Sequence, residues 1–251
     1  MAKARLPGLL LLAALLIPAA RAETRACTAP PELLEAGAPL PGTVRAVAAG
    51  SLRILVVGGV SVLGAGTSGP EAAWPARLQA LLAARRPGLA VEVVVRGRRG
   101  INTAEAGALL AEEMARAPAQ LVLWATGTVS AVRGLEVDEM VEALNTGLET
   151  LKAAGADAVL IDPQFSRFLR ANANVDPYLD ALRLVAAAHQ VPLLRRWDLM
   201  RYWAETEQVD VERAAKPERV AATDRLNDCL AQAVAALLRD GAAEARATSR
   251  N

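Results

Sequence analysis

The residues that could carry chemistry stand directly after apolar runs of this 251-residue chain. A glycine-rich turn, Gly58-Gly-Val-Ser-Val-Leu-Gly-Ala-Gly66, follows the first run and contains Ser61. Three arginines, Arg96, Arg98 and Arg99, follow the second run. A serine hydroxyl is a candidate nucleophile when a base activates it, and arginines are candidate donors to an anion. These residue types point to acyl transfer or to anion binding.

Strands and helices alternate along the chain in an order that would bring these residues together. Short runs rich in β-branched residues indicate buried parallel strands, which we expect at residues 52–57, 91–95, 121–125, 158–161 and 191–194. Apolar stripes and end signals predict helices at 70–86, 137–153, 177–189, 197–205 and 224–239, and one more that begins at Asn102 or Thr103.

Five such alternations predict a three-layer α/β/α fold with a five-stranded parallel sheet. We expect the flavodoxin-like strand order 2-1-3-4-5, because it places the ends of the first three strands around one crevice. This domain should span residues 51–240. An irregular arm at 23–50, with one short helix near 32–35, should precede it, and a disordered tail at 241–251 should follow.

The glycine-rich turn resembles the first block of the SGNH (GDSL-type) hydrolases. In a close bacterial subgroup that block reads Gly-Ser-Ser-Ser-Thr-Ala-Gly-Ala-Gly, and its glycines align with those at 58, 64 and 66. The family's nucleophilic serine then falls on Val60, and Ser61 lies one place further on. The resemblance extends over residues 52–238 and implies an esterase fold with a serine nucleophile and an oxyanion hole.

The other blocks of the family are also altered. Gly100 takes the place of a backbone oxyanion donor in Arg96-Gly-Arg-Arg-Gly100, whereas Val129 replaces the asparagine donor in Gly127-Thr-Val-Ser130. The last block supplies the family's general base and the carboxylate that orients it. Its positions fall on Ala221 and Glu218. The segment Asp162-Pro-Gln164 after the fourth strand fits the same subgroup.

These replacements predict a domain without hydrolase activity. Serine hydrolysis needs a hydroxyl, an imidazole and oxyanion donors, and loss of the nucleophile or the base costs about a million-fold in turnover. The only histidine, His189, ends a helix at the edge opposite to the crevice, so we expect a structural role. Ser61 and Ser130 lack a nearby base and should bond local backbone, as turn residues do.

The leading hypothesis is an exported, inactive SGNH-hydrolase-like domain that binds a small polar or anionic ligand, or an envelope partner, in the former active-site crevice. It involves no cofactor. The candidate binding residues are Gly59, Val60, Ser61, Arg96, Arg98, Arg99, Gly100, Asn102, Thr128 and Ser130. One alternative is an active acyl or acetyl ester hydrolase acting on cell-envelope carbohydrate or lipid. Another is a purely structural envelope protein with no ligand. For the arginines at 96, 98 and 99, the alternative to anion binding is a solvated basic loop.

The first 22 residues have the pattern of a secretory signal peptide. A basic start precedes an apolar run at 6–17 and an Ala20-Arg-Ala22 end, which predicts cleavage before Glu23 and a periplasmic or secreted protein. Cleavage would remove three of the 28 basic residues and none of the 27 acidic ones, leaving 25 against 27. A nearly neutral chain argues against a nucleic-acid partner. After cleavage no transmembrane anchor remains.

Cysteine and histidine are too few for a metal cluster. The only two cysteines, Cys27 and Cys229, both lie in the part expected to be exported. Because that compartment is oxidising, we favour a disulfide between them over two separate thiols.

Overall fold

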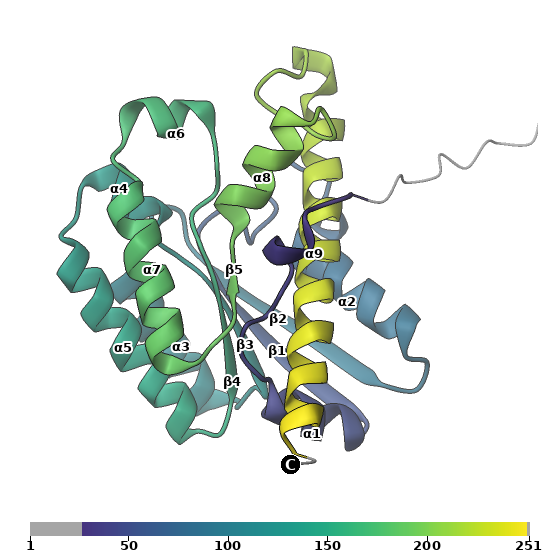
Figure 1. Ribbon diagram of the computed structural model, residues 1–251. Helices are drawn as coiled ribbons and strands as arrows, with labels where there is room; N and C mark the ends of the chain where they lie inside the picture. Colours follow the sequence, from purple (N-terminus) through teal and green to yellow (C-terminus); the bar gives the residue numbers. More distant parts are fainter. Residues whose placement is uncertain (1–26, 250–251) are drawn as a thin grey trace, which may run out of the picture.

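The computed structural model describes residues 27–249 as a parallel sheet between two layers of helices (Figure 1). The strands are β1 (Ser51–Gly58), β2 (Ala90–Gly97), β3 (Leu121–Ala125), β4 (Asp157–Ile161) and β5 (Leu193–Leu194). Every pairing is parallel and the spatial order is β2-β1-β3-β4-β5. The predicted fold class and strand order are therefore confirmed. The predicted signal peptide lies outside the described residues.

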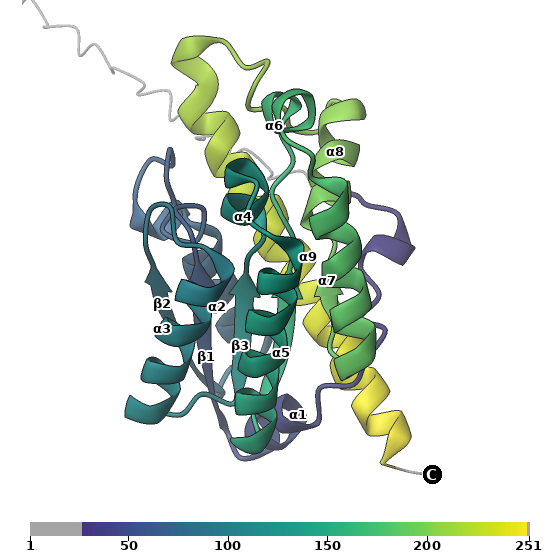
Figure 2. The ribbon, with the colours of Figure 1, turned by 90° about the vertical axis from the view of Figure 1, so that its left-hand side faces the viewer.

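Helices cover both faces of the sheet. On one face lie α1 (Pro41–Ala48), α2 (Trp74–Arg85) and α9 (Arg219–Thr248), and on the other α3 (Thr103–Arg116), α5 (Val137–Ala153) and α7 (Asp176–His189) (Figures 1 and 2). Three helices, α4 (Thr128–Arg133), α6 (Arg167–Asn172) and α8 (Arg196–Glu205), lie beyond the carboxyl ends of the strands (Figure 2). Short 3-10 helices span Pro31–Leu33, Pro70–Ala72 and Lys216–Glu218.

The alternation of side chains along β1 builds both halves of the core. Ile54 and Val56 point to the layer of α1, α2 and α9, whereas Leu55 and Val57 point to the layer of α3, α5 and α7. Gly147 on α5 allows the ring of Trp124 on β3 to lie close to the helix backbone, since a Cβ atom at position 147 would lie 2.5 Å from Trp124 Cζ3. Helix α5 therefore packs closely against β3, and each helix layer forms its own buried apolar cluster with the sheet.

The arm at 23–50 is more regular than expected, because it contains helix α1. The carboxylate of Asp157 on β4 accepts hydrogen bonds from the N–H groups of Gly42 and Thr43, at 3.0 and 2.6 Å, and from the Thr43 hydroxyl at 2.7 Å. Asp157 therefore caps this helix from 114 positions away in the sequence. No residue within the arm could have signalled the cap.

The chain also stays helical beyond residue 239, where a disordered tail was expected, because α9 continues to Thr248. Two contacts hold the extension against the arm. The Leu40 N–H donates to the Gly241 carbonyl at 3.0 Å, and the Ala36 N–H donates to Asp240 Oδ2 at 2.8 Å. The short helices α4 and α6 were not expected either.

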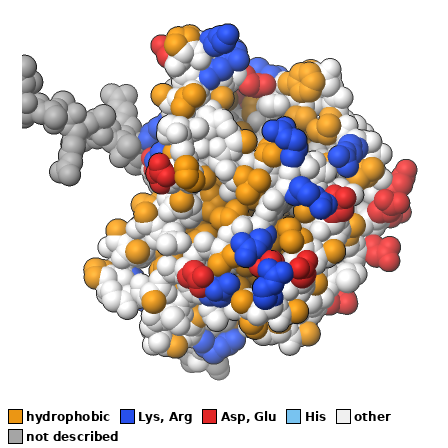
Figure 3. Space-filling view, turned by 180° about the vertical axis from the view of Figure 1, so that it is seen from behind, with side chains coloured by type: hydrophobic (Ala, Val, Ile, Leu, Met, Phe, Trp, Pro, Cys, Tyr) orange, Lys and Arg blue, Asp and Glu red, His pale blue; other side chains and the backbone are white. Residues whose placement is uncertain are grey.

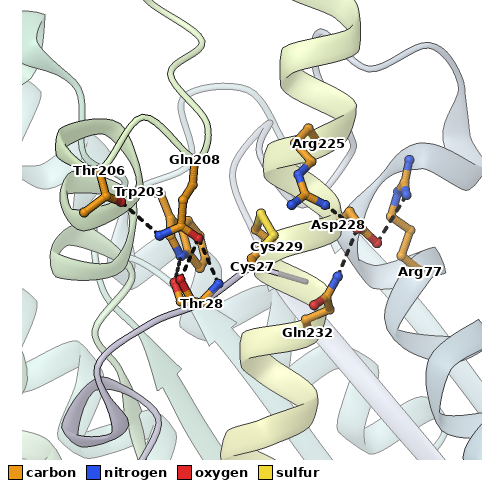
Figure 4. The surroundings of a disulfide bond; sticks show 10 residues. All are labelled: Cys27, Thr28, Arg77, Trp203, Thr206, Gln208, Arg225, Asp228, Cys229 and Gln232. Carbon is orange, nitrogen blue, oxygen red and sulfur yellow. Dashed lines mark hydrogen bonds and ion pairs between the residues drawn. A yellow bond between two sulfur atoms is a disulfide. The ribbon is translucent and has the colours of Figure 1, made fainter. Parts of the chain in front are cut away.

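A disulfide joins the start of the described chain to α9 (Figure 4). The Cα atoms of Cys27 and Cys229 are 5.3 Å apart, within the reach of a disulfide. Next to it, Trp203 Nε1 donates to the Thr28 carbonyl at 2.9 Å, and the Thr28 N–H donates to Gln208 Oε1 at 2.8 Å. The arm is thereby fixed to α8 and α9.

Surface charges of both signs are interspersed on the face seen from behind, and neither sign forms a continuous field there (Figure 3). None of the helices between residues 27 and 249 combines the length and apolarity needed to cross a bilayer.

Candidate ligand-binding site

A small hollow of about 80 Å³ lies at the carboxyl edge of the sheet. It forms there because the adjacent parallel strands β1 and β3 deliver their following loops to the same edge. Its walls come from the turn after β1, the loop after β2, the start of α4 and the start of α8. The lining residues are Gly59, Val60, Ser61, Gly100, Ile101, Ala125, Thr126, Gly127, Thr128, Val129, Gln164 and Arg196.

The turn after β1 needs glycine at its first position. A Cβ atom on Gly58 would lie 2.8 Å from Val62 Cγ1 and 2.9 Å from the Ala125 carbonyl oxygen, closer than atoms pack. The turn then closes on itself, because the Val60 carbonyl accepts from the N–H groups of Leu63 and Ala65 at 3.1 and 3.2 Å. Val60 is therefore held at the wall of the hollow by backbone bonds that do not depend on its side chain.

Arg196, the first residue of α8, brings a buried positive charge to this hollow. Its side chain belongs to a residue that is only 3% exposed. Its Nε donates to the Asp162 carbonyl at 3.0 Å, and its Nη1 donates to Ser61 Oγ at 3.1 Å. Arg196 makes no ion pair with any carboxylate between residues 27 and 249. The Ser61 hydroxyl, expected to bond local backbone, is instead the acceptor of a guanidinium.

Asp162, directly after β4, is the buried carboxyl group whose charge acts on Arg196. Its Oδ1 accepts from the Trp197 N–H at 2.8 Å, while its buried Oδ2 has no hydrogen-bond partner in the described chain. Burial raises the pKa of Asp162 to about 7, although the Trp197 N–H and the charge of Arg196 act in the opposite direction. Near neutral pH this carboxyl group is therefore ionised only in part.

Burial also lowers the pKa of Arg196, to about 10, with Asp162 opposing the shift. The guanidinium thus remains charged at neutral pH. Since Asp162 balances that charge incompletely, the hollow is electrostatically suited to an anion.

Two backbone N–H groups, those of Val60 and Gly100, are also available to bind an anion in the hollow. Within residues 27–249, neither the Val60 N–H nor the Gly100 N–H has a hydrogen-bond acceptor. Gly100 has a φ of +73°, a conformation that favours glycine, and a Cβ atom there would lie 3.0 Å from Arg133 Nη2. Gly100, at the family's backbone oxyanion-donor position, and Val60, at its nucleophile position, therefore both keep a free N–H group at the hollow.

Arg96, at the end of β2, and Arg98 and Arg99, in the loop after it, do not line the hollow, contrary to expectation. Arg96 Nε pairs with Glu113 Oε2 at 2.9 Å, and Arg98 pairs with Glu105 at 3.4 Å. Both arginines line a separate surface hollow beside α3, and the exposed Arg99 lines neither. The hydrogen bond from Arg96 lowers the pKa of the Glu113 carboxyl. Arg96 is thus paired with the buried Glu113, whereas only Arg98, in an exposed pair with Glu105, fits the solvated-loop alternative.

Asn102 and Ser130 have structural positions as well. Asn102 caps α3, since its Oδ1 accepts from the Glu105 N–H at 2.9 Å and Glu105 Oε2 accepts from the Asn102 N–H at 3.0 Å. Ser130 was expected to bond local backbone, but it is buried with its Oγ 3.2 Å from the Thr103 hydroxyl. Neither residue lines the hollow.

The residues at the family's base and carboxylate positions are exposed at the start of α9. Ala221 lies in the first turn of α9 and Glu218 in the 3-10 helix before it, and neither lines the hollow. His189 lies elsewhere, with its Nε2 2.9 Å from Asn145 Oδ1. Residues 27–249 contain no group of three or more His, Cys, Asp or Glu side chains placed to hold a metal ion.

The five-stranded parallel sheet of order 2-1-3-4-5, with helices on both faces, matches the α/β fold of the SGNH hydrolases. The sequence profile of the non-GDSL lipase-like family matches residues 26–244. The chain therefore belongs to the non-GDSL lipase-like family.

Solved structures of esterase type share this fold. TesA is 21% identical over 74% of this chain and 99% of its own, with a TM-score of 0.57. A catalytic mutant of Axe2, an acetylxylan esterase from Geobacillus stearothermophilus, is 16% identical over 73% of this chain and 94% of its own, with a TM-score of 0.58. The esterase EstA from Pseudoalteromonas sp. is 15% identical over 73% and 98%, with a TM-score of 0.53. No curated protein sequence matches significantly.

Proposed function

We propose that this protein is a catalytically inactive member of its family that binds a small anionic group in the former active-site crevice. The observation that carries the proposal is Arg196. Its buried guanidinium has no carboxylate partner within residues 27–249, and it donates to Ser61, the only serine that lines the hollow, where a hydrolase would need a base.

Four positions support the absence of hydrolysis. Val60 stands where the resemblance places the nucleophile and has no hydroxyl, and Val129 has no side-chain donor for an oxyanion. Ser61 cannot replace the nucleophile easily, because its neighbour is a cation that donates a hydrogen bond and takes no proton. The chain's one histidine is bonded to Asn145, so no imidazole serves the crevice.

The same features support binding. An anion in the hollow would meet the Arg196 charge and the free N–H groups of Val60 and Gly100. Charge-assisted bonds of this kind are among the stronger hydrogen bonds in proteins. The volume of about 80 Å³ suits a small bound group such as a carboxylate, phosphate or sulfate, whatever molecule carries it.

Titration of the protein with acetate, phosphate and sulfate tests this proposal. The amide resonances of Val60 and Gly100 should shift saturably in two-dimensional NMR spectra. Arg196→Gln should weaken binding by about ten- to a hundredfold, since bonds to charged groups contribute roughly 1.5–3 kcal/mol. Arg98→Gln is the matched control, because it removes one charge from an arginine that lies outside the hollow. The absence of any saturable shift at Gly100 would refute the binding function.

We also propose that the protein is exported after cleavage before Glu23, on the basis of the pattern at residues 1–22. Recovery of exported protein that still begins with Met1 would contradict this.

The second candidate function is an active ester hydrolase on envelope carbohydrate or lipid. The esterases among the structural neighbours favour it, and it requires a nucleophile and base other than those of the family.

A further inference from the structure

A second hollow, which we call the arginine groove, lies at the opposite end of the sheet from the crevice. It is bounded by α1, by the carboxyl end of α2 and by the last turns of α9, which approach one another at that end (Figure 1). Its volume is about 260 Å³. The floor is apolar and consists mainly of Val44, Val47, Leu52, Leu82, Leu89 and Leu238.

Four exposed arginines surround this apolar floor. Arg85 and Arg86 come from the end of α2, and Arg239 and Arg246 come from α9. None of the four forms an ion pair with an acidic side chain of residues 27–249, and none of the lining residues is acidic. The four arginines therefore give the rim of the groove a positive charge that no acidic side chain lining it neutralises.

The helical period of α9 explains why its acidic residues stay away from the groove. Ala235, Arg239, Ala242 and Arg246 recur at intervals of three and four residues and so share one face. Asp240 belongs to another face, where its carboxylate accepts the Ala36 N–H at 2.8 Å. The sequence of α9 thus sorts its charges, with basic side chains on the groove and an acidic one on the arm.

Helix ends alone do not account for this arrangement. Arginine in the last turn stabilises a helix through its dipole, which is a sufficient reason for Arg85 and Arg246 taken singly. The dipole gives no reason for an apolar floor between the two helix ends, nor for Arg239, which lies two turns before the end of α9. A ligand with both an apolar part and a negative part would satisfy floor and rim together.

We propose that the arginine groove binds a single-chain amphipathic anion, namely a medium-chain fatty-acid carboxylate. The alkyl chain lies on the valine and leucine floor, and the carboxylate is held by the arginines at the rim. A groove of about 260 Å³ is at the small end for ligand sites, which suits one narrow chain better than a bulky or two-chain lipid. This site is independent of the crevice and does not rest on the function proposed for it.

Calorimetric titration of the protein with decanoate, below the concentration at which it forms micelles, tests the proposal. We expect saturable binding that weakens as the salt concentration rises. Acetate lacks the chain and 1-decanol lacks the charge, so each should bind the groove at least tenfold more weakly. Ala242→Phe fills the groove from the partly exposed face of α9 and should abolish decanoate binding.

A pair of matched double variants separates the groove from general charge. Arg239→Gln with Arg246→Gln should weaken decanoate binding at least tenfold. Arg170→Gln with Arg219→Gln removes the same charge from exposed arginines outside the groove and should leave binding unchanged. Circular dichroism confirms that each variant is folded.

Three results would overturn the proposal. One is equal loss of affinity in both double variants, and another is equal affinity for decanoate and 1-decanol. The third is binding to phosphatidylglycerol vesicles without binding to monomeric decanoate, which would make the groove a membrane-contact surface. Loss of acetate binding in Arg196→Gln with decanoate binding intact would separate the two sites.

Discussion

Replacement of the buried Asp162 by asparagine should change how the stability of the protein depends on pH. Burial raises the pKa of Asp162 from 3.8 to about 7, so the folded state holds a proton that the unfolded state releases above about pH 4. A raised folded-state pKa stabilises the protein fully at low pH, and that contribution is lost as the pH rises to 7. The whole shift corresponds to about 4 kcal/mol at 1.36 kcal/mol per pH unit.

Between pH 5 and pH 7.5 the native protein should therefore lose about 2–3 kcal/mol of unfolding free energy through this group alone. Asp162→Asn cannot titrate and lacks this loss, so it should become more stable relative to the native protein as the pH rises. The asparagine can still accept the Trp197 N–H through its oxygen. Any cost of placing its amide where Oδ2 had no partner is the same at every pH.

Urea unfolding of both proteins at several pH values between 5 and 7.5 measures the effect. Asp180→Asn is the control, because Asp180 is an exposed carboxylate whose ion pair with Arg183 contributes little to stability. A stability difference between Asp162→Asn and the native protein that does not vary with pH would refute the assigned burial and charge of Asp162.

Three further outcomes are expected. The native protein should neither turn over short-chain esters nor react with serine-directed phosphonates, and Val60→Ser should stay inactive because the crevice has no base. Turnover above that of a heat-denatured control, if Ser61→Ala abolishes it, would favour the active-esterase alternative. Cys229→Ser should lower the unfolding free energy by about 4–5 kcal/mol, since the disulfide spans 202 residues, and denaturant titration under oxidising conditions that shows no loss would contradict this. Acetate should bind more tightly at pH 6 than at pH 8, because protonation of Asp162 leaves the Arg196 charge less balanced; calorimetry that finds the same dependence in Asp162→Asn would show that another group is responsible.

The sequence alone was sufficient for the number of strands and for much of the helix layout, since both follow from local patterns. The strand order was predicted by a different argument, which placed the ends of the first three strands around one crevice. The strand at Leu121–Ala125 and the helix at Val137–Ala153 have the predicted bounds, because an apolar run and an apolar stripe are visible within a few residues. Helix α1 was missed, because its cap is Asp157 on a distant strand. The end of α9 was missed, because contacts with the arm support it.

For the candidate site, the sequence determined which groups are absent: a valine at position 60 and an alanine at position 221 carry no reactive group in any fold. Which groups are present at the site was decided by the tertiary structure. Arg196 reaches Ser61 across 135 positions of sequence, and only packing buries it. The arginines at 96 and 98 looked free in the sequence, yet folding brings α3 and its glutamates beside them. Residue type limits the chemistry that is available, whereas burial and long-range pairing determine which charges remain free to act.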